Sequence, residues 1–178
     1  MARNKYTGDY RLIEHFDEKG RVKVTYEYIG EPYRFIQPKE KVEREKKLCL
    51  AAAAAGWVLF IAALLPHSMA MKRLWIALPY AFCAVPLALL TEQSISIYRA
   101  QEPLERRISD QLENHYPARL AVLMLFSGVA AVLSAGNLLL GSGAETGDAV
   151  FLVCSSLLYA GAVTFFRRRK WLKTGRSA

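Results

Sequence analysis

Apolar residues gather along the chain in four runs that are almost free of charge. The runs cover residues 48–65, 74–90, 120–140 and 149–166, whereas the stretches 1–47 and 91–118 are charged and polar. A helix needs about 20 mostly apolar residues to cross a hydrocarbon layer about 30 Å thick. One such run could be a core helix of a soluble protein, but four of them in 178 residues leave too little polar sequence to cover them. The pattern predicts a mainly α-helical membrane protein with a bundle of four transmembrane helices over residues 48–166.

A different alternation of apolar and polar positions precedes the first run. The segments Tyr10–Phe16 and Arg21–Tyr28 are rich in β-branched and aromatic residues, and in the second segment apolar and polar residues alternate without a break. A period of two is typical of a half-buried strand. Pro32 opens a shorter segment, Tyr33–Ile36, which suits an edge strand. These patterns predict a small three-stranded antiparallel β-meander in a domain that covers residues 1–37.

One face of this meander is rich in aromatic and β-branched side chains. A unit of fewer than about 40 residues rarely buries enough surface to be stable alone without a disulfide or a metal, and the sequence offers neither. We therefore expect the face to pack against the following helix, the loop 91–118, a second copy of the chain or another protein. The candidate docking face consists of Val22, Val24, Tyr26, Tyr28, Tyr33 and Phe35.

Two polar segments join these parts, and a third ends the chain. Residues 38–47 form a charged linker that we expect to turn helical, and residues 167–178 form a basic tail. The cytoplasmic loop 91–118 has apolar residues at helical spacing, which predicts an amphipathic helix with Leu104, Ile108 and Leu112 on one face. This face could lie on the membrane surface or against the β-meander. We favour the meander, because that contact would bury both apolar faces.

The distribution of positive charge predicts the orientation in the membrane. The net charge is +8, and 22 of the 24 Lys and Arg residues lie in the stretches 1–47, 91–119 and 167–178. Lys and Arg in short flanking segments are retained on the cytoplasmic side. We expect a multi-pass protein of the cell membrane with both termini in the cytoplasm. Topology and attraction to anionic lipid head groups account for the charge, so the lipid bilayer is the expected partner and nucleic acid is not.

No motif in the sequence specifies a reaction, a cofactor or a metal. The three cysteines, Cys49, Cys83 and Cys154, lie in or beside apolar runs without C-x-x-C spacing. P-loop, Rossmann, zinc-protease and nucleophile signatures are absent from the sequence. We expect no catalytic, cofactor-binding or metal-binding residues, and therefore a protein that is not an enzyme.

Two functions of different kinds fit these patterns. The first is a non-enzymatic accessory, assembly or regulatory subunit that docks a partner protein through its cytoplasmic β-domain. The second is a small four-span transporter or channel subunit acting as a homo-oligomer. The second rests on Pro79 and Pro86 in the second run and on Asn137 in the third, with Glu92 as the nearest ionisable group. The lack of charge near the centre of any run argues against ion coupling.

Overall fold

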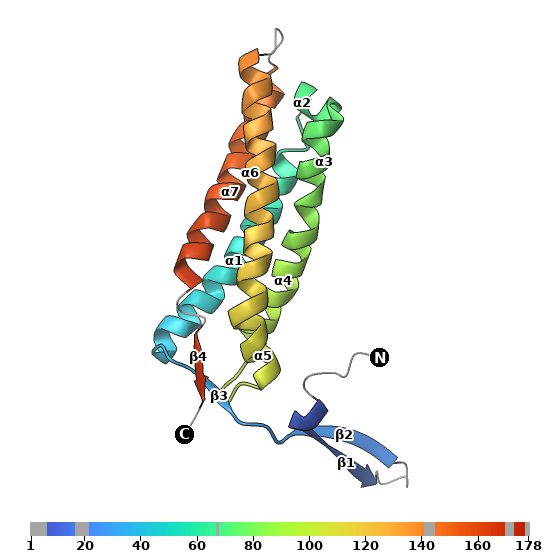
Figure 1. Cartoon of the computed structure of the whole chain (residues 1–178), viewed down its shortest axis with the longest axis vertical. Helices are drawn as coiled ribbons and strands as arrows, with labels where there is room; N and C mark the ends of the chain where they lie inside the picture. The colour runs from blue at the N-terminus through green and yellow to red at the C-terminus, as the bar shows by residue number, and fades with distance from the viewer. Residues whose placement is uncertain (1–6, 17–21, 67, 141–144, 170–172, 177–178) are drawn as a thin grey trace.

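Four helical segments follow the four apolar runs, as the computed structural model of the chain shows (Figure 1). The structure describes residues 7–16, 22–66, 68–140, 145–169 and 173–176. The long helices are α1 (Lys39–Ala62), α4 (Ala84–Arg99), α6 (Tyr116–Leu140) and α7 (Thr146–Arg168), with α3 (Leu74–Phe82) preceding α4 and a short α2 (Met69–Lys72) before it.

The long helices pack side by side as a bundle. Helix α1 packs against α4 and α7, and α6 packs against α3, α4 and α7. Helices α1 and α4 approach closely at Gly56, where an added Cβ atom would lie 2.9 Å from Leu87 Cδ2 and would make that leucine side chain shift. The rings of Phe60, Tyr80 and Phe151 meet inside the bundle, with centroids 5.0 and 4.7 Å apart. The mainly α-helical prediction is confirmed.

The second apolar run forms two helices because of its prolines. Pro86 has no N–H, and its ring would clash with the carbonyl of a continuous helix one turn earlier, at Phe82. The chain accordingly leaves α3 at Phe82 and enters α4 at Ala84, while the Cys83 N–H bonds to the Tyr80 carbonyl at 2.9 Å. The two pieces still follow one another along the bundle (Figure 1).

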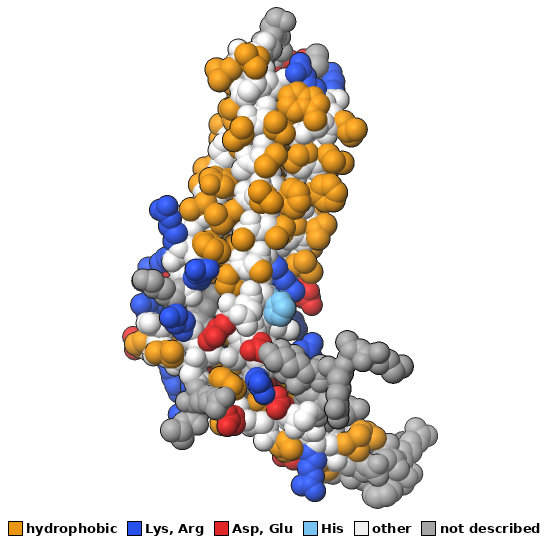
Figure 2. All heavy atoms as spheres, viewed as in Figure 1, with side chains coloured by type: hydrophobic (Ala, Val, Ile, Leu, Met, Phe, Trp, Pro, Cys, Tyr) orange, Lys and Arg blue, Asp and Glu red, His pale blue; other side chains and the backbone are white. Residues whose placement is uncertain are grey.

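Apolar side chains cover the outside of the bundle as well as its inside. Figure 2 shows them over most of the shaft, with charged side chains gathered towards the end that carries the β structure. Large exposed apolar patches are uncommon on soluble monomers. Within the described residues, three helical stretches are long and apolar enough to cross a membrane, namely Leu74–Arg99, Arg106–Leu140 and Thr146–Arg168.

The prediction of four such helices is therefore wrong by one, and α1 is the exception. Its uncharged part within the helix covers only Leu48–Ala62, which extends about 22 Å at 1.5 Å per residue. Glu45, Lys46 and Lys47 directly precede it, so a longer window brings in three charges. Helix α1 belongs to the bundle because it packs against α4 and α7. Its own length and composition are not those of a membrane-crossing helix.

The β structure is antiparallel, as predicted, but it forms two two-stranded sheets instead of one sheet of three. Strand β1 (Tyr10–Phe16) pairs with β2 (Val22–Tyr28), and β3 (Tyr33–Phe35) pairs with β4 (Thr174–Arg176) from the basic tail. The other side of β3 is used as well, since Tyr33 and Leu104 exchange backbone hydrogen bonds of 2.8 and 3.0 Å. The three-stranded meander is therefore corrected, because non-local partners occupy β3. Residues 17–21, which connect β1 to β2, lie outside the described residues.

The segment 91–118 is divided between two helices that continue into the bundle. Helix α4 runs on to Arg99, and α5 (Arg106–Asp110) continues through a π-helical turn, η2 (Gln111–His115), into α6. Between them, residues 100–105 are not helical, because Leu104 bonds to Tyr33 instead of to a helical neighbour. The single amphipathic helix expected here is therefore interrupted.

Candidate docking surface

The register of β1 and β2 brings most of the predicted docking face onto one side of a hairpin. Tyr10 lies opposite Tyr28, Leu12 opposite Tyr26, and Glu14 opposite Val24. Directly opposed residues of an antiparallel pair point to the same face. The hairpin face therefore contains the predicted Val22, Val24, Tyr26 and Tyr28 in one row. The side chains of Val22 and Tyr26 lie outside the part of the chain whose side chains are described.

The other two predicted members, Tyr33 and Phe35, lie in the second sheet. Phe35 is buried in the core cluster with an exposed fraction of 8%, and the Lys46 ammonium lies 5.6 Å from the centre of its ring. Tyr33 is half-buried and packs against the same cluster. Phe35 therefore stabilises the junction between sheet and bundle and presents little surface to a partner.

The hairpin is attached to the bundle at its base by polar contacts. The Arg106 backbone N–H donates to the Tyr28 hydroxyl at 3.0 Å, and the Tyr10 hydroxyl donates to the Glu105 carboxylate. The two tyrosine rings meet edge to face, with centroids 5.4 Å apart. The Arg106 guanidinium also lies 3.9 Å from the Asp9 carboxylate. These contacts fix the direction in which the hairpin leaves the bundle (Figure 1).

The contact with Glu105 changes the acidity of Tyr10. A carboxylate that accepts the phenolic proton favours the neutral phenol, and partial burial acts in the same direction. Together with the nearby negative charge of Glu105, these effects raise the pKa of Tyr10 to about 12. The hydroxyl is therefore protonated, and can donate, throughout the physiological pH range.

Away from its base, the hairpin face is open. Leu12 is 50% exposed and Val24 is 46% exposed, and both lie on the same face of the hairpin as Tyr10 and Tyr28. Among the described residues, neither outer edge of the hairpin pairs with a third strand. Exposed edges of this kind accept strands from other chains unless they are protected. Within the described residues, the hairpin thus leaves an apolar face exposed and both outer edges unpaired.

The predicted loop face, Leu104, Ile108 and Leu112, is directed into the molecule. Leu104 and Leu112 are buried with exposed fractions of 1% and 0%, and Ile108 packs against the same core cluster. The sequence left two surroundings open for this face, the membrane surface and the β-meander. In the structure, the face packs inside the protein instead of on its surface. The contact with β structure runs through β3, by way of Tyr33 and Leu104.

Buried charges at the base of the bundle were not anticipated from the sequence. Lys46 is 5% exposed, and its ammonium donates to the Ala100 carbonyl, at the C-terminal end of α4, at 2.7 Å. A cation there stabilises the helix by interacting with its dipole. Glu45 is 6% exposed and pairs with Arg168 of α7 at 3.2 Å. The sequence contained a sign of this burial. The buried positions of α1 recur every three or four residues, and Val42 and Lys46 continue that spacing into the charged segment.

A buried carboxylate at the opposite end was also missed. Asp148 was assigned to a polar loop, yet it is 1% exposed. One of its oxygens accepts from the Ser68 hydroxyl at 2.7 Å and the Ala70 N–H at 2.9 Å, and the other accepts from the Glu145 N–H at 3.2 Å. Asp148 thus completes the N-terminal capping box of α7 and holds α2 beside it.

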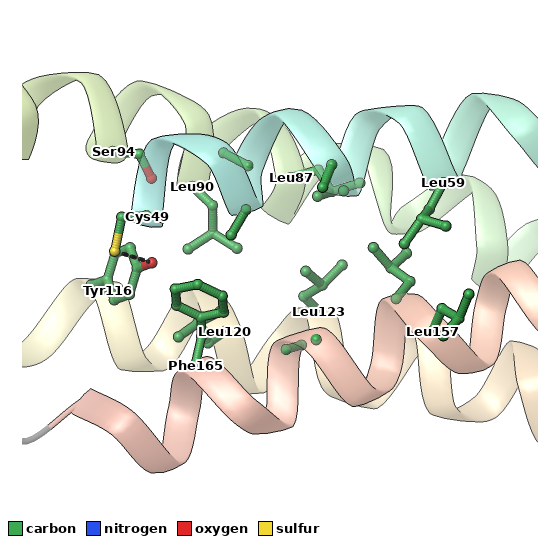
Figure 3. A pocket seen from close by; sticks show the side chains of 17 residues that line it. Cys49, Leu59, Leu87, Leu90, Ser94, Tyr116, Leu120, Leu123, Leu157 and Phe165 are labelled. Atoms are coloured by element: carbon green, nitrogen blue, oxygen red, sulfur yellow. Dashed lines mark hydrogen bonds between the residues drawn. The ribbon is translucent and has the colours of Figure 1, made fainter. Parts of the chain in front are cut away.

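A cavity of about 230 Å³, partly open to the outside of the bundle, lies between α1, α4, α6 and α7. Figure 3 shows leucine side chains along most of it, with Cys49 and Tyr116 at one end, where the thiol and the hydroxyl are 3.2 Å apart. Its lining residues are apolar apart from Cys49, Ser94 and Tyr116. Such a space is suited to apolar groups and not to hydrated ions.

Comparison with known proteins adds no further assignment: no family model, no curated protein and no solved structure matches this chain. Within the described residues, no three His, Cys, Asp or Glu side chains lie together in a way that could hold a metal ion. The hairpin face is therefore the feature on which a functional proposal rests.

Proposed function

We propose that this chain is a multi-pass protein of the cell membrane that acts as a non-enzymatic accessory, assembly or regulatory subunit. In this proposal the bundle lies in the bilayer and the β1–β2 hairpin docks a cytoplasmic partner protein. The observation that carries it is the half-exposed apolar pair Leu12 and Val24 on a hairpin whose base is fixed to the bundle.

The proposed orientation places both terminal segments in the cytoplasm. Strand β4 comes from the C-terminal tail and pairs with β3 from the N-terminal region, so both segments belong to the same end of the bundle. Most Lys and Arg residues also lie in these segments, which favours the cytoplasmic side. Reporter domains fused to the two ends should both be active in the cytoplasm, and a reporter active on the outer side would contradict this orientation.

Transport is the alternative, and the buried polar groups give it less support. Glu45 and Lys46 lie at one end of the bundle and Asp148 lies at the other. Asn137 is buried in α6, whereas Glu92 is exposed on α4. The cavity between these ends has a mostly apolar lining. A solute pathway would need polar groups that replace hydration along its length.

The docking proposal is tested by purifying the full chain in mild detergent from membranes that contain its natural partners. The test variant is the double substitution Leu12→Ser with Val24→Ser, which makes the exposed hairpin face polar. The matched control is Arg11→Ser with Glu27→Ser, an exposed cross-strand pair on the opposite face. Mass spectrometry then measures the amount of each co-purified protein per chain.

We expect a stoichiometric partner to be retained by the wild type and by the control, and to be lost from the test variant. Equal retention by both variants would contradict a docking role for this face. A monodisperse wild-type chain without a partner would contradict the subunit proposal as a whole. If the retained protein is a second copy of this chain, the hairpin is a self-association site.

A further inference from the structure

A polar cleft of about 320 Å³ lies beside the bundle, apart from the hairpin face. Three consecutive parts of the chain form it: the second half of α4, the segment α5 with η2, and the first turn of α6. Its volume falls in the range of small-molecule sites, roughly 300–1,000 Å³. The lining residues used below are Glu92, Gln93, Glu105, Arg107, Gln111 and Arg119.

The cleft lies at the height where the apolar surface of the bundle ends. The Arg119 guanidinium donates through Nη1 to the Leu89 carbonyl at 2.7 Å and to Gln93 Oε1 at 3.0 Å, so the three residues share one level. The apolar run of α6 begins at the next residue, Leu120, and the apolar run of α4 ends at Leu90. Figure 2 shows the same boundary between apolar and charged side chains. In a membrane this is the level of the lipid head groups.

Internal hydrogen bonds hold the cleft in shape before any ligand binds. Gln93 is 3% exposed, and its amide donates to the Gln111 carbonyl. The Tyr116 N–H, one π-helical turn later, also donates to that carbonyl. On the opposite wall, the Tyr10 hydroxyl donates to Glu105. Preorganised side chains lose less conformational entropy when they bind a ligand.

The charges that line the cleft balance in number, two carboxylates against two guanidinium groups. The hydrogen bonds of Arg119 go to neutral acceptors, which leave its positive charge uncompensated. Glu92 and Arg107 are exposed, and no ion pair joins either of them to another described residue. A ligand with one anionic and one cationic group can complement such a set, whereas a purely anionic ligand would face two carboxylates.

We propose that this cleft binds a zwitterionic aminophosphate group, as found in the head group of phosphatidylethanolamine. The phosphate is bound by Arg107 and Arg119, since guanidinium groups match phosphate oxygens in geometry and charge. The primary ammonium is bound by Glu92 and Glu105. The site goes beyond the proposed docking function and shares with it only the placement of the bundle in a membrane.

The test uses the full chain in detergent and four probes. Short-chain phosphatidylethanolamine, phosphatidylcholine and phosphatidylglycerol with identical acyl chains are titrated and followed by native mass spectrometry. Free phosphoethanolamine is titrated by calorimetry. The test variants are Arg107→Gln and Glu92→Gln, both at exposed positions. The controls are Arg99→Gln and Glu40→Gln, which are exposed and do not line the cleft.

We expect phosphatidylethanolamine to bind about tenfold more tightly than the other two lipids, and each test variant to weaken it about tenfold while the controls do not. Glu92→Lys should shift the preference towards phosphatidylglycerol, a gain that an unfolded protein cannot show. Equal binding of the three lipids, or unchanged binding by both test variants, would overturn the proposal. Binding of free phosphoethanolamine with the same variant dependence would identify a soluble source of the ligand. Binding of the lipid alone would identify the bilayer as its source.

Discussion

The molecule contains two small antiparallel sheets that differ in what surrounds them. The β3–β4 sheet joins strands that are more than 130 residues apart and is built into the base of the bundle through Phe35. The β1–β2 hairpin joins neighbouring strands, and among the described residues its attachment runs through polar contacts of Asp9, Tyr10 and Tyr28. An isolated two-stranded sheet is marginally stable in water, so both depend on their neighbours. One sheet is built into the base of the bundle, and the other leaves an apolar face exposed.

The difference shows that strand pattern alone does not determine the role of a sheet. Tyr33, Phe35 and the residues of β1 and β2 belong to similar aromatic, alternating segments. Phe35 is covered because it lies in the core cluster, beside Lys46 of α1 and opposite Thr174 of the tail. Leu12 and Val24 have no comparable cover. The three predictions that follow test this contrast, in order of decreasing expected effect.

The largest effect is expected from removing the buried ring of the β3–β4 sheet. Phe35→Ala should lower the free energy of unfolding by about 3–5 kcal/mol, since it removes an aromatic side chain from a packed core. Leu12→Ala, at a half-exposed position on the hairpin, should change it by less than about 0.5 kcal/mol. Denaturant titration in detergent measures both. Similar losses for the two variants would show that the sheets do not differ as described.

A smaller effect is expected at the link between the tail and η2. The Glu113 carboxylate accepts from the Thr174 N–H at 2.8 Å and from the Thr174 hydroxyl at 2.9 Å. Glu113→Ala should destabilise the β3–β4 sheet by about 1 kcal/mol, because the single oxygen, Oε1, that accepts both hydrogen bonds is removed at an exposed site. Faster hydrogen exchange at the amides of β3 and β4 would report the loss. Glu113→Gln keeps an acceptor oxygen and should lie between the alanine variant and the wild type. Unchanged exchange in the alanine variant would show that pairing with β3 and the contact between the Thr174 and Ser109 hydroxyls hold the tail without Glu113.

The parts of this fold that sequence patterns predicted are those that depend on local information. Long apolar runs gave the helices of the bundle, and alternation gave β1, β2 and β3 close to their observed ends. Strand β4 was missed because Thr174-Gly175-Arg176 is too short to show a period, and its pairing with β3 is non-local. The pairing of Leu104 with Tyr33, within the non-helical residues 100–105, was missed for the same reason.

The candidate sites show the same limit. The face shared by Val24 and Tyr28 follows from a period of two, so it could be derived before the structure was known. The burial of Phe35 could not, because it depends on α1 and on the tail. Lys46 could have been found by extending the buried period of α1 into its charged segment. The polar cleft could not, since Arg119 and Glu92 are brought together by a helix connection that the sequence does not specify.

The smallest expected effect is a dependence on pH that is confined to the base of the hairpin. The pKa of Tyr10 is raised from its ordinary value near 10 to about 12, mainly by the hydrogen bond to Glu105. A group whose pKa is higher in the folded state stabilises that state while it is protonated. The contribution of Tyr10 is therefore complete below pH 10 and is lost as the pH rises to about 12. Carbon NMR of labelled tyrosine rings, assigned with Tyr10→Phe, measures this titration directly.

Glu105→Gln should move the Tyr10 midpoint back towards 10, because it removes the negative charge and the strong acceptor together. A wild-type midpoint near 10 would mean that the hydroxyl does not donate to Glu105, and the hairpin would then be held by Tyr28 and Asp9 alone among the polar contacts described at its base.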